Sequence, residues 1–127
     1  MVAIPASLLA EIIGRASARP HVETCGLLFG TSDRIDAVRH TTNVAACADD
    51  SFEIDPAALL AAMRAERAGG PRLVGHYHSH PNGSPQPSTR DLEAAEPGRL
   101  WLIVAGGAAR LWLAEEGGFR ALAVEPV

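Results

Sequence analysis

The sequence predicts a mixed α/β fold, in which helices pack on a curved mixed β-sheet. Three observations indicate this class. An apolar stripe at helical spacing opens the chain, a second helix is bounded by a capping acid and a Gly-Gly pair, and two later apolar runs flank another Gly-Gly pair as a hairpin. With 127 residues, the chain is long enough for one domain, residues 1–127, with a single core.

The first half of the chain begins with a helix and continues with strands. We expect the helix over residues 5–18, and Pro20 ends it. Strands are expected over residues 24–29 and 35–44, followed by a short extended segment over residues 51–54. The apolar stripe that indicates the helix consists of Leu8, Leu9, Ile12, Ile13 and Ala16.

The second half begins with another helix. It is predicted over residues 56–68, because Asp55 supplies an N-cap carboxylate and two glycines follow the last turn. The remaining predicted elements are a strand over residues 73–80, a short helix over residues 89–95, and strands over residues 100–105, 109–114 and 119–124.

Composition and charge exclude several classes of protein. The formal net charge of −4 provides no basic surface for nucleic acid or for an acidic membrane. The most apolar region, residues 100–114, is interrupted by Gly106, Gly107 and Arg110, so it is too short to span a membrane. The N-terminus lacks the pattern of an export signal, and we therefore expect a cytoplasmic protein.

Three histidines, His76, His78 and His80, alternate on one predicted strand. Alternate side chains share a face, with neighbours about 6.5 Å apart and the outer two about 13 Å apart. Because a zinc–nitrogen bond measures only about 2.1 Å, two adjacent histidines can hold one metal ion, but three on a straight strand cannot. The pair is His76/His78 or His78/His80, and the loop that begins at Pro81 favours the second.

Ser88 follows His80 after seven residues, and Asp91 lies three residues further on. A serine followed three residues later by an acid is a capping box, which begins many helices. The pair could therefore do no more than cap the short helix, although a first helical turn would also aim the Asp91 carboxylate rigidly. Spaced histidines are ambiguous too, since they can be exposed or hydrogen-bonded in a core. The spaced histidines and the Ser88–Asp91 pair together indicate a metal site more specifically than either pattern alone.

The His-Ser-His run of residues 78–80 and the Ser-Thr-Arg-Asp run of residues 88–91 together resemble the signature of the JAMM (MPN-plus, Mov34-type) zinc metallopeptidases. The upstream glutamate of that signature is matched by Glu23, just before the Cys-Gly-Leu-Leu-Phe-Gly run of residues 25–30. The resemblance covers nearly the whole chain. It implies a compact fold related in layout to the cytidine deaminases.

The resemblance implies one zinc ion per chain, held by His78, His80 and Asp91. A structural zinc is normally closed by four protein ligands, so three leave the open position of a catalytic site. The resemblance also implies that Glu23 acts as general base and then as general acid. The Ser88 hydroxyl is expected to stabilise the oxyanion of a tetrahedral intermediate.

Neighbouring side chains are expected to support the site or the core. His76 is expected to pack beside the site rather than to bind metal, and Tyr77 and Ser79 to point to the opposite side of the strand. Trp101 and Trp112 lie in apolar strands and are expected in the core.

Two cysteines are too few for a disulfide framework. Cys25 and Cys47 are each expected to be a small, partly buried residue of a reducing compartment. Because Cys25 lies two residues from Glu23, it could also face the same side and touch the site.

By resemblance, the substrate is a ubiquitin-like protein that is cut after its glycine-ending tail. The turn after Gly30 and the connection from Asp91 to Trp101 are too short for the extra loops with which deubiquitinating members grip ubiquitin. The implied partner is therefore a small ubiquitin-like or sulfur-carrier protein with a Gly-Gly tail, and neither nucleic acid nor a membrane.

Two other functions remain to be weighed. Metal-free members of the resembled family are scaffolds that bind partner subunits, but they lack the ligand set that this chain carries. A zinc nucleobase deaminase needs a Pro-Cys-x-x-Cys run in addition to a His-x-Glu run, and no Pro-Cys-x-x-Cys run occurs here. The predicted function is a zinc-dependent peptidase or isopeptidase, with the non-catalytic scaffold as the alternative.

Overall fold

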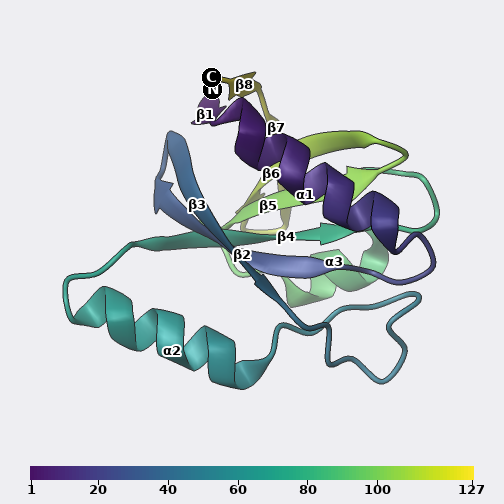
Figure 1. Ribbon diagram of the computed structural model, residues 1–127, viewed down its shortest axis with the longest axis horizontal. Coiled ribbons are helices and arrows are strands. Elements are labelled where there is room, and N and C mark those ends of the chain that lie inside the picture. Colours follow the sequence, from purple (N-terminus) through teal and green to yellow (C-terminus); the bar gives the residue numbers. More distant parts are fainter.

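The computed structural model describes residues 1–127 and shows one eight-stranded mixed sheet with three helices (Figure 1). The helices are α1 (Ala6–Ala18), α2 (Pro56–Arg67) and α3 (Thr89–Ala94). The strands are β1 (Val2–Ile4), β2 (Cys25–Thr31), β3 (Arg34–Thr41), β4 (Leu73–Ser79), β5 (Leu100–Ala105), β6 (Ala108–Glu115), β7 (Gly118–Leu122) and β8 (Val124–Pro126).

The strand order β7-β6-β5-β4-β2-β3-β1-β8 explains the curvature of the sheet. The β4–β5, β1–β3 and β1–β8 pairs are parallel, and the other neighbouring pairs are antiparallel. Only Ala123 separates β7 from β8, although these strands lie at opposite ends of the order. The sheet must therefore curve back on itself, and the predicted curved mixed sheet is confirmed.

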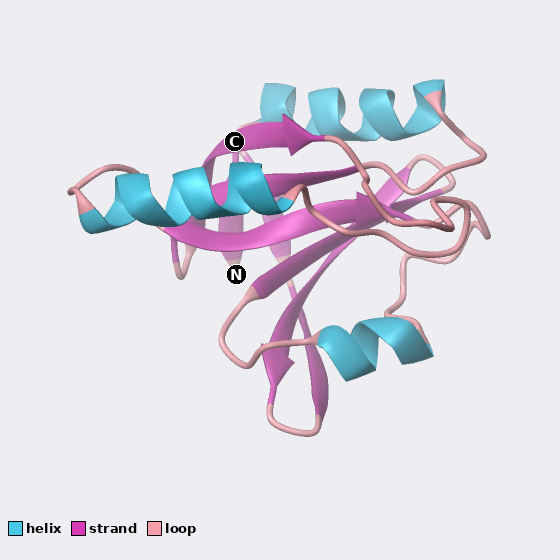
Figure 2. Ribbon diagram, turned by 90° about the horizontal axis from the view of Figure 1, so that it is seen from below, coloured by secondary structure: helices cyan, strands magenta, loops and turns pink.

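The sheet separates two apolar layers of unequal size. Figure 1 shows α1 above the sheet and α2 below it, and in Figure 2, which is seen from below, α2 lies in front of the strands. On the α1 face, Ile12 packs into a cluster of twelve buried residues. On the α2 face, Ala62 packs with Leu27 and Leu73. Burial of these apolar side chains is the main stabilising contribution to the fold.

Tyr77 shows how β4 divides its side chains between the two layers. The Tyr77 ring is fully buried in the α1-side cluster, and its hydroxyl lies 2.6 Å from Nδ1 of His40. A Cβ atom added at Gly26, the residue opposite Tyr77 on β2, would overlap the ring. Tyr77 thus points away from the layer that contains its neighbours His76 and His78, as the alternation of a strand predicts.

Most predicted elements are present, and the differences lie at chain ends and strand ends. The strand β1 was not predicted, because it has three residues and pairs only with strands distant in sequence. The strand predicted over residues 35–44 ends at Thr41, and the strand predicted over 119–124 is divided at Ala123. The Asp55 cap is confirmed, since its Oδ1 accepts a hydrogen bond from the Ala57 amide at 3.0 Å.

The cysteines are unpaired and differ from each other in burial. Cys25 is fully buried, and its Sγ lies 3.5 Å from Oγ1 of Thr41 on β3, so its contact is with the neighbouring strand. Burial raises the pKa of the Cys25 thiol. Cys47 is exposed, contrary to the expected partial burial, because it lies in the loop between β3 and α2. No helix is long and apolar enough to cross a membrane.

Candidate metal centre

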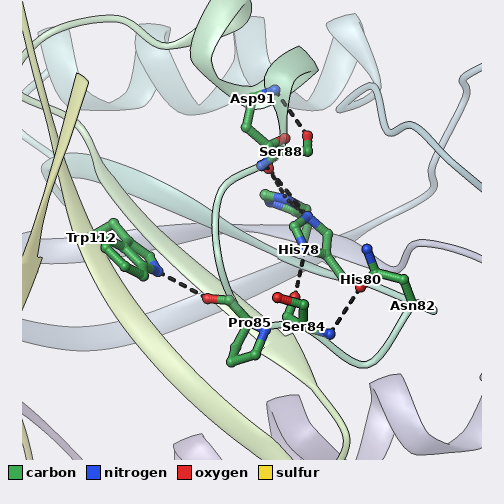
Figure 3. A network of polar contacts seen from close by, with 8 residues as sticks. All are labelled: His78, His80, Asn82, Ser84, Pro85, Ser88, Asp91 and Trp112. Atoms are coloured by element: carbon green, nitrogen blue, oxygen red, sulfur yellow. Dashed lines mark hydrogen bonds and ion pairs between the residues drawn. The ribbon is translucent and has the colours of Figure 1, made fainter. Parts of the chain in front are cut away.

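Three donor atoms from two elements meet at the end of β4. Nε2 of His78 and Nε2 of His80 lie 2.9 Å apart. Oδ2 of Asp91, on α3, lies 3.4 Å from the first and 3.2 Å from the second. Figure 3 shows the three side chains pointing toward one another. All three residues are buried, with 0%, 6% and 4% of their surface exposed.

This spacing matches a tetrahedral metal site. Metal–ligand bonds of 2.0–2.1 Å at tetrahedral angles place the ligand atoms about 3.3 Å from one another. The observed separations of 2.9 Å, 3.2 Å and 3.4 Å lie close to that value. Two imidazole nitrogens and a carboxylate oxygen are also a donor set that suits zinc. The residues present therefore fit a bound zinc ion.

Glu23 could take the place of Asp91 as the third metal ligand beside His78 and His80. Its carboxylate oxygen and the ligand nitrogens of His78 and His80 all lie within 4.8 Å of one another. The set with Asp91 is tighter, because all of its separations are 3.4 Å or less. The structure thus brings four predicted site residues together, with Asp91 in the closer ligand position.

The tautomer of His80 leaves the metal-facing nitrogen free. Nδ1 of His80 lies 2.8 Å from the Ser84 carbonyl oxygen, which can only accept a hydrogen bond. The proton of neutral His80 is therefore on Nδ1, and Nε2 keeps its lone pair. In histidines that bind a metal ion, the second ring nitrogen typically donates to a backbone carbonyl or a carboxylate in this way.

The loop that supplies this carbonyl is held at two further points. The Ser84 amide donates to Oδ1 of Asn82 at 2.9 Å, and Nε1 of Trp112 donates to the Pro85 carbonyl at 3.0 Å (Figure 3). Trp112 is only half-buried, so the expectation that it belongs to the core is wrong. Its indole N–H needs a partner, and the loop carbonyl provides one.

We expect Trp112→Phe to weaken zinc binding by less than about 10-fold, the lower end of the loss seen for outer partners of metal ligands. The substitution removes the hydrogen bond to Pro85 and keeps most of the ring. Zinc competition titrations measure the effect. Unchanged affinity would show that the loop holds His80 without Trp112.

Ser88 and Asp91 form the predicted capping box. Oγ of Ser88 accepts from the Asp91 amide at 3.1 Å, and the Ser88 amide donates to Oδ2 of Asp91 at 2.8 Å. The same Oδ2 atom faces both histidines, so the cap also aims the ligand. Because capping uses a lone pair of Oγ, the hydroxyl hydrogen of Ser88 remains free to donate.

Ser88→Ala tests whether that hydroxyl does more than cap the helix. We expect kcat to fall about 100-fold, as for loss of one oxyanion donor, and stability to fall by about 1 kcal/mol. Ser88→Thr keeps both the cap and the hydroxyl and is expected to stay near wild type. A Ser88→Ala enzyme that loses stability alone would restrict Ser88 to capping.

Burial and proximity set the protonation of the ligands before any metal binds. Burial raises the pKa of Asp91, but hydrogen bonds with His78 and His80 outweigh it and hold that pKa well below its usual value. Burial lowers the pKa of His78, and this effect dominates. Burial also acts to lower the pKa of His80, yet its hydrogen bonds with Asp91 and Ser84 raise it overall. The Asp91 carboxylate is therefore ionised and the His78 imidazole neutral, as metal ligands must be, whereas a cation must displace the Nε2 proton that Asp91 favours on His80.

An aromatic wall lines one side of the ligands. The Phe52 ring stacks on His78, with ring centroids 4.1 Å apart and an interplanar angle of 16°. His76 packs edge-on against Trp101 at 4.3 Å, and burial lowers the pKa of His76 to about 3, so His76 is neutral. Nδ1 of His78 is buried without a hydrogen-bond partner. Stacking on Phe52 therefore orients the His78 ring, as the hydrogen bond to the Ser84 carbonyl orients His80.

Glu23 lies just before β2, beside the ligands. The residue is 6% exposed, and burial raises the pKa of its carboxyl to about 7, although the charge of His80 acts to lower it. A cleft of about 490 Å³ begins at Glu23 and Asp91 and extends past Phe52 to Trp101. A carboxyl group that titrates near neutral pH in a cleft can both accept and donate a proton.

A curved mixed sheet that carries a His-x-His pair facing an aspartate and a buried glutamate defines a JAMM-type hydrolase. The family model described as prokaryotic homologs of the JAB domain matches residues 5–117, and the chain belongs to this family.

Relatives of known name support the same class. A Haloferax volcanii protein named desampylase is 36% identical over 124 residues, which cover 93% of this chain and 88% of the relative. A Thermus thermophilus protein named probable TtuB-protein conjugate cleaving protease is 32% identical over 121 residues, which cover 95% of this chain and 81% of the relative.

Solved structures share the fold. The solution structure of a Desulfitobacterium hafniense protein matches with a TM-score of 0.82 and 26% identity, over 100% of this chain and 93% of that protein. The crystal structure of a JAB1/MPN domain protein from Archaeoglobus fulgidus matches with a TM-score of 0.65 and 21% identity, over 99% and 97% of the two chains.

Proposed function

We propose that this chain is a zinc-dependent peptidase or isopeptidase that hydrolyses the amide bond after the C-terminal Gly-Gly of a ubiquitin-like or sulfur-carrier protein. One zinc ion per chain would be held by His78, His80 and Asp91. The observation that carries the proposal is the meeting of three ligand atoms, 2.9 Å to 3.4 Å apart, beside the buried carboxyl group of Glu23. The names of the two relatives, desampylase and probable TtuB-protein conjugate cleaving protease, support the substrate class.

The position of each side chain supports the role that we propose for it. A bound zinc ion supplies a Lewis acid and lowers the pKa of water to about 7. Glu23 takes a proton from the attacking water and returns it to the amine that leaves, since its pKa of about 7 suits both transfers. The free hydroxyl hydrogen of Ser88 donates to the oxyanion. His80 and Asp91 stay fixed during the reaction, because the Ser84 carbonyl and the helix cap orient them.

The cleft supports an extended, small-residue tail as the substrate segment. Its lining includes Glu23, Phe52, Ile54 and Trp101. Glycine residues bring no side chain to clash with such walls, so a Gly-Gly end can approach the ligands closely. The β2–β3 turn and the α3–β5 connection carry no inserted elements, which favours a small partner over ubiquitin chains. The two unpaired cysteines are consistent with action in the cytoplasm.

Mass spectrometry of cleavage products tests the proposal. Small ubiquitin-like proteins that end in Gly-Gly followed by a short extension are incubated with wild type, with Glu23→Gln, and with wild type plus a zinc chelator. We expect cutting immediately after Gly-Gly by the wild type alone. Cutting elsewhere, or equal cutting in all three samples, would contradict the proposal. Tight binding without cutting would favour the scaffold alternative.

A further inference from the structure

The backbone N–H and C=O of Glu23 bind the loop between β3 and α2, whereas the flanking residues Val22 and Thr24 bind Ser79 at the end of β4. The β2–β4 ladder begins at Cys25, so Glu23 lies in the irregular segment that precedes it. The Glu23 amide donates to the Ala48 carbonyl at 2.7 Å, and the Glu23 carbonyl accepts from Nδ2 of Asn43 at 2.8 Å. Both partners belong to the loop between β3 and α2. The loop therefore fixes the Glu23 peptide groups between two neighbours that are anchored to β4.

The side chain of Asn43 makes four hydrogen bonds to backbone groups, three of them within the loop. Its Nδ2 donates to the carbonyls of Glu23 and Ser51, at 2.8 Å and 2.9 Å. Its Oδ1 accepts from the amides of Ala45 and Glu53, both at 3.0 Å. All four hydrogen-bonding positions of the amide group are thus used. A flipped amide would face two carbonyls with its oxygen and two N–H groups with its nitrogen, so the orientation is fixed.

The same loop also touches a metal ligand. Phe52 lies between Ser51 and Glu53, the two residues that Asn43 binds, and its ring stacks on His78 at 4.1 Å. One half-buried amide side chain therefore links the backbone of Glu23 to the residue that covers His78. Nothing in the His-x-His or Ser-x-x-Asp runs points to Asn43, which lies 20 residues from Glu23 in sequence.

We propose that Asn43 is a positioning residue for the reaction, which fixes the Glu23 carboxyl group relative to the ligand histidines. This inference rests on the proposed role of Glu23 as general base. Proton transfer requires contact within about 2.6–3.2 Å. A displacement of about 1 Å at a positioned group can cost on the order of 100-fold in rate. Asn43 itself makes no hydrogen bond to the ligands or to the carboxyl group of Glu23.

Asn43→Asp tests the inference with nearly unchanged shape. The variant keeps an acceptor for the Ala45 and Glu53 amides but loses both donors, and its carboxylate faces the Glu23 carbonyl. We expect kcat per bound zinc to fall about 10-fold to 100-fold, with KM and zinc stoichiometry unchanged. Ser51→Ala is the matched control, since it removes only the hydrogen bond from Ser51 Oγ to the Cys47 carbonyl within the loop. It is expected to keep the wild-type kcat.

A readout independent of activity is hydrogen exchange by NMR in the metal-free protein. In wild type, we expect the side-chain amide protons of Asn43 and the backbone amide of Glu23 to be protected. In Asn43→Asp, the Glu23 amide is expected to exchange at least about 10-fold faster, while amides of β4 and β5 keep their protection. Freely exchanging Asn43 protons in wild type would overturn the inference even if the variant failed to fold.

The outcomes separate the two proposals. A wild type that cleaves no Gly-Gly substrate contradicts the proposed function, and the exchange data still decide whether Asn43 fixes Glu23. An Asn43→Asp enzyme that matches wild type in kcat per zinc overturns the positioning role, whatever its thermal stability. The positioning role would also be overturned if Ser51→Ala lowered kcat as much as Asn43→Asp does. A general loosening of the loop would then be enough to explain the loss of activity.

Discussion

Glu23→Gln is expected to lower kcat by about 10²–10⁴-fold, the usual contribution of a positioned general acid–base group. The amide has nearly the same shape as the carboxyl group but cannot take up the proton of the attacking water. Zinc content and KM are expected to stay at the wild-type level, because His78, His80 and Asp91 are unchanged. Steady-state kinetics normalised to bound zinc measure the effect. Wild-type turnover by Glu23→Gln would identify another group as the base.

The same substitution is expected to stabilise the metal-free protein. Burial raises the pKa of Glu23 from 4.5 to about 7 in the folded chain, so the folded state binds more protons than the unfolded state between these pH values. The free energy of unfolding therefore decreases as the pH rises from 4.5 through 7. Glutamine does not ionise, and above pH 7 we expect Glu23→Gln to be more stable by up to about 3 kcal/mol. Denaturant unfolding at pH 5 and pH 8 measures the difference, which is expected to be several-fold larger at the higher pH.

Removal of either ligand histidine is expected to abolish zinc binding and turnover together. His78→Ala or His80→Ala takes away one of three donors, so zinc affinity is expected to fall by more than about 100-fold, beyond the loss that outer partners cause. Competition with a chromophoric chelator measures the affinity, and circular dichroism verifies that each variant is folded. Full zinc occupancy in either variant would contradict the ligand assignment.

His76→Ala is the matched control for these variants. It removes a histidine from the same face of β4. His76 packs against Trp101 and is not one of the three proposed metal ligands. We expect zinc affinity to remain near wild type, with a loss of stability from the cavity beside Trp101. If His76→Ala alone abolished zinc binding, the metal would be held by the other adjacent pair of histidines.

Sequence patterns predicted those parts of the site that are formed by residues close together in the chain. The alternation of His78 and His80 predicts that both face one side, and the spacing of Ser88 and Asp91 predicts a capped helix; both features are present. The role of His80 depends on the Ser84 carbonyl, however, and no residue type marks a backbone carbonyl in a sequence. That contact could be found only from the fold.

Contacts between distant segments were not predictable for the same reason. The strand β1 pairs with β3 and β8, and neither pairing leaves a signal in a run of three residues. Trp112 looks like a core residue because its strand is apolar, but β6 places its indole N–H beside the Pro85 carbonyl. Asn43 falls near the end of the strand predicted over residues 35–44, and only the fold brings it within hydrogen-bonding distance of Glu23. Polar side chains that bind distant backbone groups are therefore the features that sequence reasoning missed.

Anomalous diffraction at the zinc edge from crystals of the zinc-loaded protein tests the central claim most directly. The account predicts one anomalous peak per chain, bonded to Nε2 of His78, Nε2 of His80 and a carboxylate oxygen of Asp91, with Glu23 outside bonding distance. A peak bonded to Glu23 in place of Asp91, or a peak away from these histidines, would contradict it.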